Sequence, residues 1–256
     1  MEPLLLHHRD DRGVVTLTLN RPHAFNALSE AMLDALGESL DALAADEAVR
    51  AVVLGATGKA FCAGHDLKEM RAEPSVEYYQ RLFAQCSAVM LSIQRLPVPV
   101  IARVHGLATA AGCQLVAMCD LAVAGEDARF AVSGINVGLF CATPGVALSR
   151  NVPRKAAFEM LVTGEFVSAE QARELGLINT VAAPEALDDA VEELVARIVA
   201  KPRIAVAMGK ALFYRQIEAG IEVAYQDAGV TMACNMMDPC ALEGVQAFIE
   251  KRTPNW

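Results

Sequence analysis

The chain has 256 residues, of which 54% are hydrophobic and 21% are charged. A chain this apolar buries enough surface to offset the entropy lost on folding, which excludes intrinsic disorder. Its 22 basic and 31 acidic side chains give a net charge of −9, and an acidic surface argues against a nucleic-acid partner. The sequence contains no run of about 20 apolar residues, so we expect no membrane span.

The 7 cysteines are scattered without any Cys-x-x-Cys pair, and the 5 histidines lack the spacing of a zinc site. We therefore expect buried, reduced thiols and no bound metal. The first twelve residues are charged and polar, without the apolar stretch of a signal peptide. These features together predict a cytoplasmic protein.

Strand and helix patterns alternate in the first part of the chain. Such alternation implies parallel strands joined by crossover helices, and hence an α/β fold. Pro97 and Pro99 lie at the start of the predicted strand 97–102, and prolines in a sheet are typical of a strand start or an edge strand. The predicted strands are 14–19, 51–54, 97–102 and 121–124. One helix is predicted to begin after Ser29, a second covers 78–96, and a third follows a turn within 107–119.

From about Pro144 onward the pattern becomes mostly helical. Helices dominate the last quarter of the chain, and a terminal helical set with apolar faces of its own often covers a neighbour or another subunit. The predicted helices are 155–161, 168–175, 184–199, 202–217 and 242–251.

The segment after the strand at 51–54 is the first candidate site. It reads Ala-Phe-Cys-Ala-Gly-His-Asp-Leu-Lys-Glu-Met from 60 to 70. Gly64 permits a backbone geometry closed to larger residues and would leave a nearby N–H free to point at a ligand. An ordinary loop between a strand and a helix explains the same glycine, so this segment alone is not diagnostic.

The second candidate segment, 105–115, reads His-Gly-Leu-Ala-Thr-Ala-Ala-Gly-Cys-Gln-Leu. Its small residues would let a ligand lie against the backbone. The first turn of the following helix offers unpaired N–H groups and a positive dipole end, which stabilise an anion or a developing oxyanion. Close packing of a helix is the alternative explanation for the same residues.

Together the two segments resemble the crotonase, or enoyl-CoA hydratase/isomerase, superfamily. The resemblance begins at Leu-Asn-Arg-Pro (19–22), runs through both segments and ends at Phe-Ile-Glu-Lys-Arg (248–252), so it covers nearly the whole chain. The string Asn-Val-Gly-Leu-Phe-Cys (136–141) is similar to that of the enoyl-CoA hydratase domain-containing proteins that lack both catalytic glutamates.

The resemblance implies a fold of repeated ββα turns stacked as a spiral, formed by residues 1–195. Residues 196–256 would then form a helical trimerisation region, which makes a homotrimer or a homohexamer the implied assembly. The implied ligand is an acyl thioester of coenzyme A, and no cofactor is implied beyond the coenzyme A of the substrate itself.

The resemblance also implies which residues meet the ligand. The backbone N–H groups of His65 and Ala111 would bind the thioester oxygen, with Ala111 in place of the usual glycine. Two such preorganised donors stabilise the negative charge that forms on this oxygen. The segment His65, Asp66, Leu67 and Lys68 would meet the adenine and pantetheine of coenzyme A.

The resemblance breaks at the carboxylates. Hydratases of this family place one glutamate at the position of Gln114 and a second twenty residues later, where this chain has Gly134. Neither residue exchanges a proton near neutral pH, and a positioned acid or base contributes about 10²–10⁴-fold in rate. We therefore expect glutamate-assisted water addition to be crippled while thioester binding is retained.

Several side chains could replace the missing carboxylates. His65 has an imidazole suited to proton transfer, although an exposed or ligand-covering histidine is the commoner case. The resemblance implies that Asp66 faces the nucleotide part of coenzyme A. Cys141 has no neighbouring cation in the sequence that would stabilise its thiolate. Further candidates, for an acyl hydroxyl or a water molecule, are Ser133, Asn136 and Thr143.

Three functional hypotheses stay open. The first is an enzyme on CoA thioesters that catalyses hydration, isomerisation, decarboxylation or hydrolysis. The second is an acyl-CoA-binding module without chemistry, and the third is a structural oligomer partner. Two ligand-facing segments disfavour the third hypothesis. The resemblance favours the enzyme over the module, because other branches of the family use different side chains around the same pair of backbone donors.

Overall fold

The computed structural model describes residues 2–72 and 74–256. Its strands form two sheets, and each strand described is only two to six residues long. They are β1 (Leu5–Arg9), β2 (Val14–Leu19), β3 (Ala51–Ala56), β4 (Ala60–Cys62), β5 (Val100–Val104), β6 (Leu107–Thr109), β7 (Leu121–Gly125), β8 (Arg129–Ala131), β9 (Val167–Ser168) and β10 (Thr180–Ala182).

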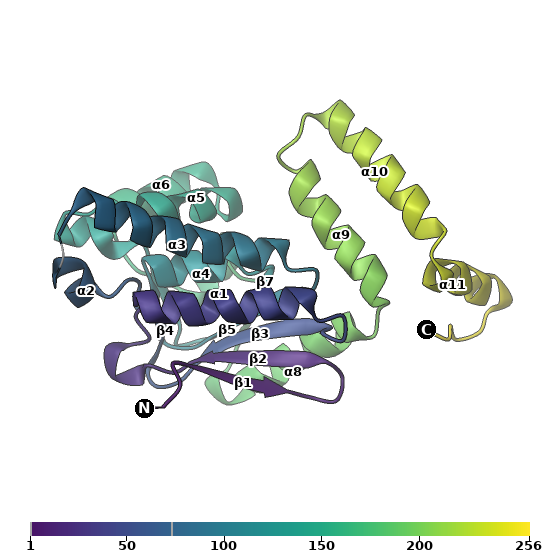
Figure 1. Ribbon diagram of the computed structural model, residues 1–256, viewed down its shortest axis with the longest axis horizontal. Coiled ribbons are helices and arrows are strands. Elements are labelled where there is room, and N and C mark those ends of the chain that lie inside the picture. The colour runs from purple at the N-terminus through teal and green to yellow at the C-terminus, as the bar shows by residue number, and fades with distance from the viewer. Residues whose placement is uncertain (1, 73) are drawn as a thin grey trace.

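The α-helices surround these sheets and continue beyond them (Figure 1). Short 3₁₀ turns lie at Pro22–Ala24, Ser133–Val137 and Pro184–Ala186. The helices are α1 (Glu30–Ala45), α2 (Leu67–Ala72), α3 (Val76–Arg95), α4 (Ala111–Met118), α5 (Ala142–Asn151), α6 (Arg154–Thr163), α7 (Ala169–Glu174), α8 (Leu187–Val199), α9 (Arg203–Gln216), α10 (Ile221–Met236) and α11 (Pro239–Glu250).

The larger sheet has the order β1-β2-β3-β5-β7-β10, and all its pairings are parallel except the β1–β2 hairpin. Successive residues of its strands are buried on opposite faces. Val53, Ile101 and Val123 pack with α8, whereas Leu54 and Ala102 belong to the main core. Burial on both faces explains why the central strands are apolar runs without alternation.

The smaller sheet has the order β4-β6-β8-β9. Each of its first three strands follows a strand of the larger sheet: β4 follows β3, β6 follows β5, and β8 follows β7. A helix then leads back to the next strand of the larger sheet after β4 and again after β6. The chain therefore repeats a ββα turn, and the expected α/β spiral fold is confirmed.

The element boundaries differ from the prediction where prolines intervene. The strand predicted from Pro97 begins only at Val100, because proline has no N–H to donate to a ladder. The helix predicted from Pro184 opens with a 3₁₀ turn, and its α-helical part begins at Leu187. The division at 195 stays a prediction, and α8 runs across that position.

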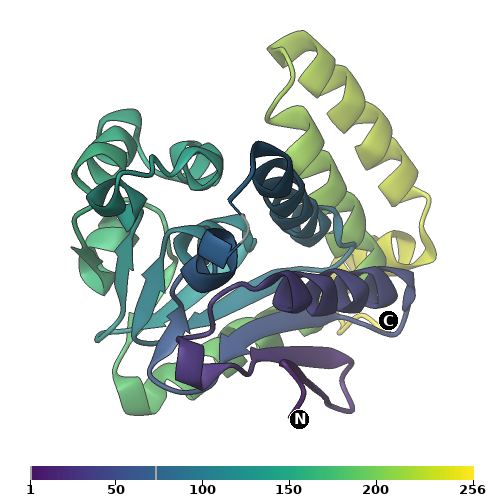
Figure 2. The ribbon, with the colours of Figure 1, turned by 60° about the vertical axis from the view of Figure 1, so that its left-hand side comes forward.

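We call α9, α10 and α11 the C-terminal arm. Figure 2 shows α9 and α10 side by side, with α10 on the side away from the sheets. None of the residues of α10 is buried, and Tyr225 on this helix is 75% exposed. No helix among the residues that the structure describes is long and apolar enough to cross a lipid bilayer.

A buried ion pair attaches the arm to the rest of the molecule. The Nζ of Lys210 on α9 lies 2.7 Å from Oδ2 of Asp120, which precedes β7, and it also donates to the carbonyls of Ile93 and Val98. The hydroxyl of Tyr214, one turn further along α9, donates to the other oxygen of Asp120. The arm is thus fixed at its base.

Candidate functional site

The two candidate segments meet beyond the carboxyl ends of β4 and β6. The hydroxyl of Thr109 donates to the carbonyl of Ala63 over 3.1 Å. A Cβ atom on Gly112 would lie 2.1 Å from the carbonyl oxygen of Cys62, so the two backbones touch where the second segment enters α4. Only glycine allows this approach.

Gly64 brings the first segment against the amide of Ala111. Its φ of +92° is a conformation that residues with a side chain rarely adopt. A Cβ atom at this position would lie 3.3 Å from the backbone nitrogen of Ala111 and 2.9 Å from the Cβ of Ala110. The residue just before His65 is therefore in van der Waals contact with the start of α4.

The backbone N–H of His65 points away from Leu28, the residue that pairs with it in an isolated bridge. Leu28 donates to the carbonyl of Gly64 and accepts from the N–H of Asp66, which makes a parallel bridge centred on His65. In such a bridge the N–H of the central residue faces the opposite side. Among the described residues it has no hydrogen-bond acceptor.

The backbone N–H of Ala111 is also unpaired. Ala111 is the first residue of α4, and the first bond of this helix runs from the N–H of Gln114 to the carbonyl of Ala110. The N–H groups of a first turn have no partner within their own helix, and no side chain caps this one. The two predicted donors thus lie on touching segments, and both are free.

Ala110 holds the first turn of α4 in a strained conformation. Its φ of 50° and ψ of −118° lie in a region that residues other than glycine rarely adopt. Such a conformation costs on the order of 1–3 kcal/mol and persists only where the surroundings impose it. The N–H of Ala110 donates to the carbonyl of Ala131 in β8, which fixes the turn in this orientation.

Two polar side chains beside these donors have buried atoms without partners. Both ring nitrogens of His65 and the Oε1 of Gln114 lack a hydrogen bond among the described residues. Gln114 is itself only 5% exposed. Nearly all buried polar groups in folded proteins are paired with protein or water, so these unpaired atoms call for an explanation.

Aromatic rings of α3 line the side of His65. The ring of Phe83 meets the imidazole edge-to-face with centroids 5.5 Å apart, and Tyr79 stacks on Phe83. Burial lowers the pKa of His65 below its ordinary value, while the nearby carbonyl of Leu28 opposes the shift without hydrogen-bond geometry to either nitrogen. The imidazole is consequently neutral at pH 7.

Asp66 has a structural role in the fold. Its carboxylate forms an ion pair with Arg21 at 2.7 Å and accepts the N–H groups of Lys68 and Glu69 at the start of α2. Burial would raise the pKa of Asp66, but these bonds outweigh it and hold the pKa below the ordinary value. The carboxylate is therefore ionised and already occupied.

Leu67 and Lys68 are the exposed members of the first segment. They begin α2, Leu67 is 57% exposed, and the ammonium group of Lys68 has no ion-pair partner among residues 2–72 and 74–256. An apolar side chain and a free cation therefore stand next to each other at the outer end of the segment.

The position of Gly134 is already filled by its neighbours. A Cβ atom there would lie 2.6 Å from the carbonyl oxygen of Leu139 and 2.8 Å from the Sγ of Cys141. This sulfur accepts the N–H of Gly134. Burial raises the pKa of Cys141, and the hydrogen bond from Gly134 only partly opposes it, so the thiol is protonated and packed.

Sequence reasoning did not assign a role to Asn26, which ties the first segment to the sheet. Its side chain accepts the N–H of Arg21 and donates to the carbonyls of Thr57 and Ala60. Asn26 is fully buried with a φ of 53°. A signal was present, since asparagine tolerates this left-handed conformation better than most residues.

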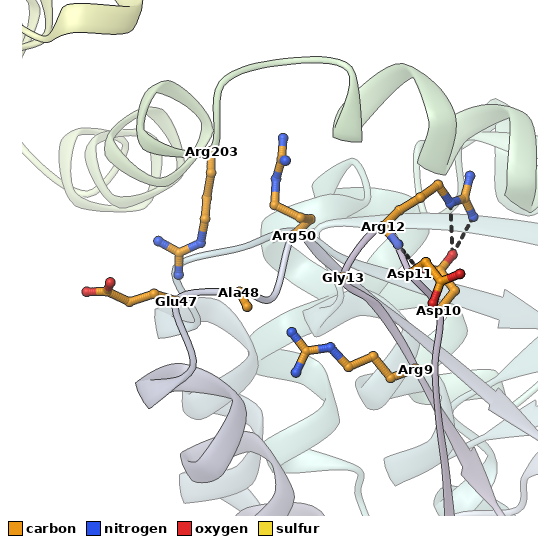
Figure 3. Close-up of a pocket in the computed structure, with 9 residues that line it drawn as sticks. All are labelled: Arg9, Asp10, Asp11, Arg12, Gly13, Glu47, Ala48, Arg50 and Arg203. Carbon is orange, nitrogen blue, oxygen red and sulfur yellow. Dashed lines mark hydrogen bonds and ion pairs between the residues drawn. The ribbon is translucent and has the colours of Figure 1, made fainter. Parts of the chain in front are cut away.

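A surface hollow beside the residues that precede β2 and β3 is rich in arginine (Figure 3). Its cations are already engaged: Arg12 pairs with Asp10 and Glu192, and Arg50 donates to backbone carbonyls. We assign it no part in the site. Its lining residues are Arg9, Asp10, Asp11, Arg12, Gly13, Glu47, Ala48, Arg50 and Arg203.

Comparison with known proteins identifies the family of this chain. The enoyl-CoA hydratase/isomerase family model matches residues 9–256. Enoyl-CoA hydratase domain-containing protein 3, mitochondrial, from Rattus norvegicus is 45% identical over 255 residues, which cover 100% of this chain and 85% of the relative.

Solved structures give the same result. The crystal structure of an enoyl-CoA hydratase from Mycobacterium smegmatis is 80% identical, with a TM-score of 0.99 over 100% of this chain and 99% of that one. That of human enoyl-CoA hydratase domain-containing protein 3 is 42% identical, with a TM-score of 0.96 over 99% and 100%. The family match and the shared fold agree, and the chain belongs to the enoyl-CoA hydratase/isomerase, or crotonase, family.

Proposed function

We propose that the chain binds acyl-CoA thioesters and acts on them as an enzyme of the hydratase/isomerase type. The thioester oxygen lies between the backbone N–H groups of His65 and Ala111. The observation that carries this proposal is that both N–H groups are unpaired and belong to segments in contact.

The two donors serve reactions in which negative charge develops on the thioester oxygen. Proton removal beside the carbonyl and addition to a conjugated double bond both have this property. Losing one such donor typically costs about 10²–10³ in rate. The strain held at Ala110 keeps the Ala111 donor oriented before the substrate arrives.

The remaining residues of the first segment bind the coenzyme A portion in this proposal. Lys68 supplies an unpaired cation for a phosphate and Leu67 an apolar contact. Asp66 contributes by holding the start of α2 in place through Arg21 and two backbone amides.

The usual pair of catalytic glutamates has no part in this proposal. Gln114 stands at the first of the two positions and does not titrate, and Gly134 stands at the second. The space beside Gly134 is occupied by Leu139 and Cys141, so a carboxylate does not fit there without movement of the backbone.

A matched pair of ligands tests thioester binding. Butyryl-CoA and S-butyl-CoA differ only in the carbonyl oxygen, so calorimetric titration with both isolates the contact made by the two donors. Two hydrogen bonds at about 0.5–1.5 kcal/mol each predict that S-butyl-CoA binds roughly 5- to 150-fold more weakly. Equal affinities would refute the assignment of the donors.

A binding module without chemistry is the second candidate, and Gln114 and Gly134 favour it. The loss of absorbance of crotonyl-CoA separates the two functions. Turnover supports the enzyme, whereas binding without turnover on a panel of enoyl-CoA thioesters supports the module.

We also propose that the C-terminal arm forms a homotrimer or a homohexamer. The apolar side chains of α10 are exposed in the single chain, as expected for a surface that a neighbouring copy covers. Light scattering that gave the mass of a monomer would reject this proposal.

We propose the cytoplasm as the compartment of this protein, because its free thiols fit a reducing environment. Cell fractionation tests this proposal.

A further inference from the structure

We propose that the imidazole of His65 carries the proton in the reaction at the bound acyl group. This inference rests on the proposed function, because it requires the thioester to be held by the N–H of the same residue. His65 would then contribute twice, through a backbone donor to the oxygen and through a side chain near the carbons beside it.

The first argument is the state of the imidazole. Both its ring nitrogens are buried and without partners, although a neutral imidazole has one donor and one acceptor to satisfy. Buried polar groups in folded proteins are paired in about nine cases out of ten, with the protein or with an ordered water, so two unpaired nitrogens on one ring call for a partner. In this proposal a bound substrate or water molecule supplies the missing partner.

The second argument is the surroundings of the ring. Phe83 presents an aromatic ring to it, and the hydroxyl of Tyr79 is committed to the carbonyl of Met70. The adjacent carboxylate of Asp66 is paired with Arg21. Burial lowers the pKa of His65, and no charged group contributes to the shift, so the neutral, basic form is present at pH 7.

The third argument is that the other candidates are unsuited to the role. Cys141 accepts the N–H of Gly134, and burial raises its pKa, so no thiolate is available. Gln114 does not titrate, but its unpaired Oε1 can accept a hydrogen bond from a water molecule and orient it.

The proposed step is addition of water to an enoyl-CoA. The water oxygen forms a bond to the β-carbon while one of its protons passes to the free nitrogen of His65. The electron pair of the double bond moves onto the thioester oxygen as an enolate, held by the two backbone donors. The imidazolium then returns its proton to the α-carbon, which completes the 3-hydroxyacyl-CoA and restores the neutral imidazole.

The test uses substitutions that keep every backbone donor. His65→Ala removes the imidazole, His65→Gln keeps hydrogen bonding without titration, and His8→Ala is the control, since His8 is an exposed histidine on β1. We expect both His65 variants to hydrate crotonyl-CoA about 10²–10⁴-fold more slowly. We expect the affinity of both His65 variants and of the control for butyryl-CoA to stay within about threefold of that of the starting protein.

The pH dependence of kcat provides a readout that a merely structural role would not move. The rate of the unmodified protein should fall on the acid side as His65 becomes protonated, below the ordinary histidine range, and this limb should vanish from the residual rate of His65→Gln. The inference fails if His65→Ala keeps its rate, or if the unmodified protein binds butyryl-CoA and turns over no enoyl-CoA. Failure of the proposed function is separate, since S-butyl-CoA would then bind as well as butyryl-CoA in every variant.

Discussion

Gly64 and Ala110 touch across the two site segments, so that a methyl group on Gly64 would lie 2.9 Å from the Cβ of Ala110. The glycine also has a φ of +92°. Gly64→Ala should therefore destabilise the fold by about 1–3 kcal/mol and push the donors of His65 and Ala111 apart. Urea unfolding and titration with butyryl-CoA measure both effects, and unchanged stability would contradict the contact.

Ala110→Gly should have the opposite effect on stability. Glycine adopts the backbone angles of Ala110 without strain, which should raise the free energy of unfolding by about 1 kcal/mol after the entropy of the unfolded chain is counted. In the double variant, part of the cost of Gly64→Ala should disappear because the two methyl groups no longer meet. Additive effects in this cycle would show that the two positions do not interact.

A glutamate introduced at position 134 should not restore the hydratase chemistry of the family. The Cβ of any side chain there meets Leu139 and Cys141, so Gly134→Glu should lower the free energy of unfolding by about 1–3 kcal/mol and gain no hydration activity. Gly134→Ala isolates the cost of the Cβ atom. Gln114→Glu is the control, because it introduces a glutamate in place of a side chain of nearly equal size. A Gly134→Glu protein as stable as the original would disprove the steric argument.

The ion pair of Asp66 and Arg21 predicts a particular pH dependence. The folded pKa of Asp66 lies below its ordinary value of 3.8, so its stabilising effect is present above that value and disappears as the pH falls through the folded pKa. Asp66→Asn should cost about 1–3 kcal/mol at pH 7 and progressively less below pH 4. Asp11→Asn, at an exposed carboxylate, is the control, and a cost that did not change with pH would exclude the charge as its cause.

The buried pair at the base of the arm predicts a large effect on stability. Lys210→Met leaves Asp120 without its cation and should cost about 3–5 kcal/mol, measured by urea unfolding. Lys201→Met, at an exposed lysine in the turn before α9, should change stability little. If both substitutions had the same small effect, the attachment of α9 would not depend on this pair.

The parts of the fold that were predictable have strong local patterns. The strand Val14–Leu19 alternates, and Ala51–Leu54 is a buried apolar run, so both were found. The strands of the smaller sheet are too short to show a period. Helix α10 was missed because its apolar side chains face outward and it has no buried stripe to set a helical period.

For the site, the segments could be predicted and their fine geometry could not. Glycine and small residues marked the places that hold His65 and Ala111. The strain at Ala110, the occupied space beside Gly134 and the unpaired imidazole arise from contacts between segments distant in sequence. No local pattern encodes such contacts.

The outward-facing apolar side chains of α10 link folding to protein concentration. If copies of the chain cover this helix, as proposed, the melting temperature should rise as the solution becomes more concentrated, since association draws the equilibrium toward the native form. Dilution would then lower the melting temperature without any change of buffer. Measurements on variants of this protein are therefore comparable only at one shared protomer concentration.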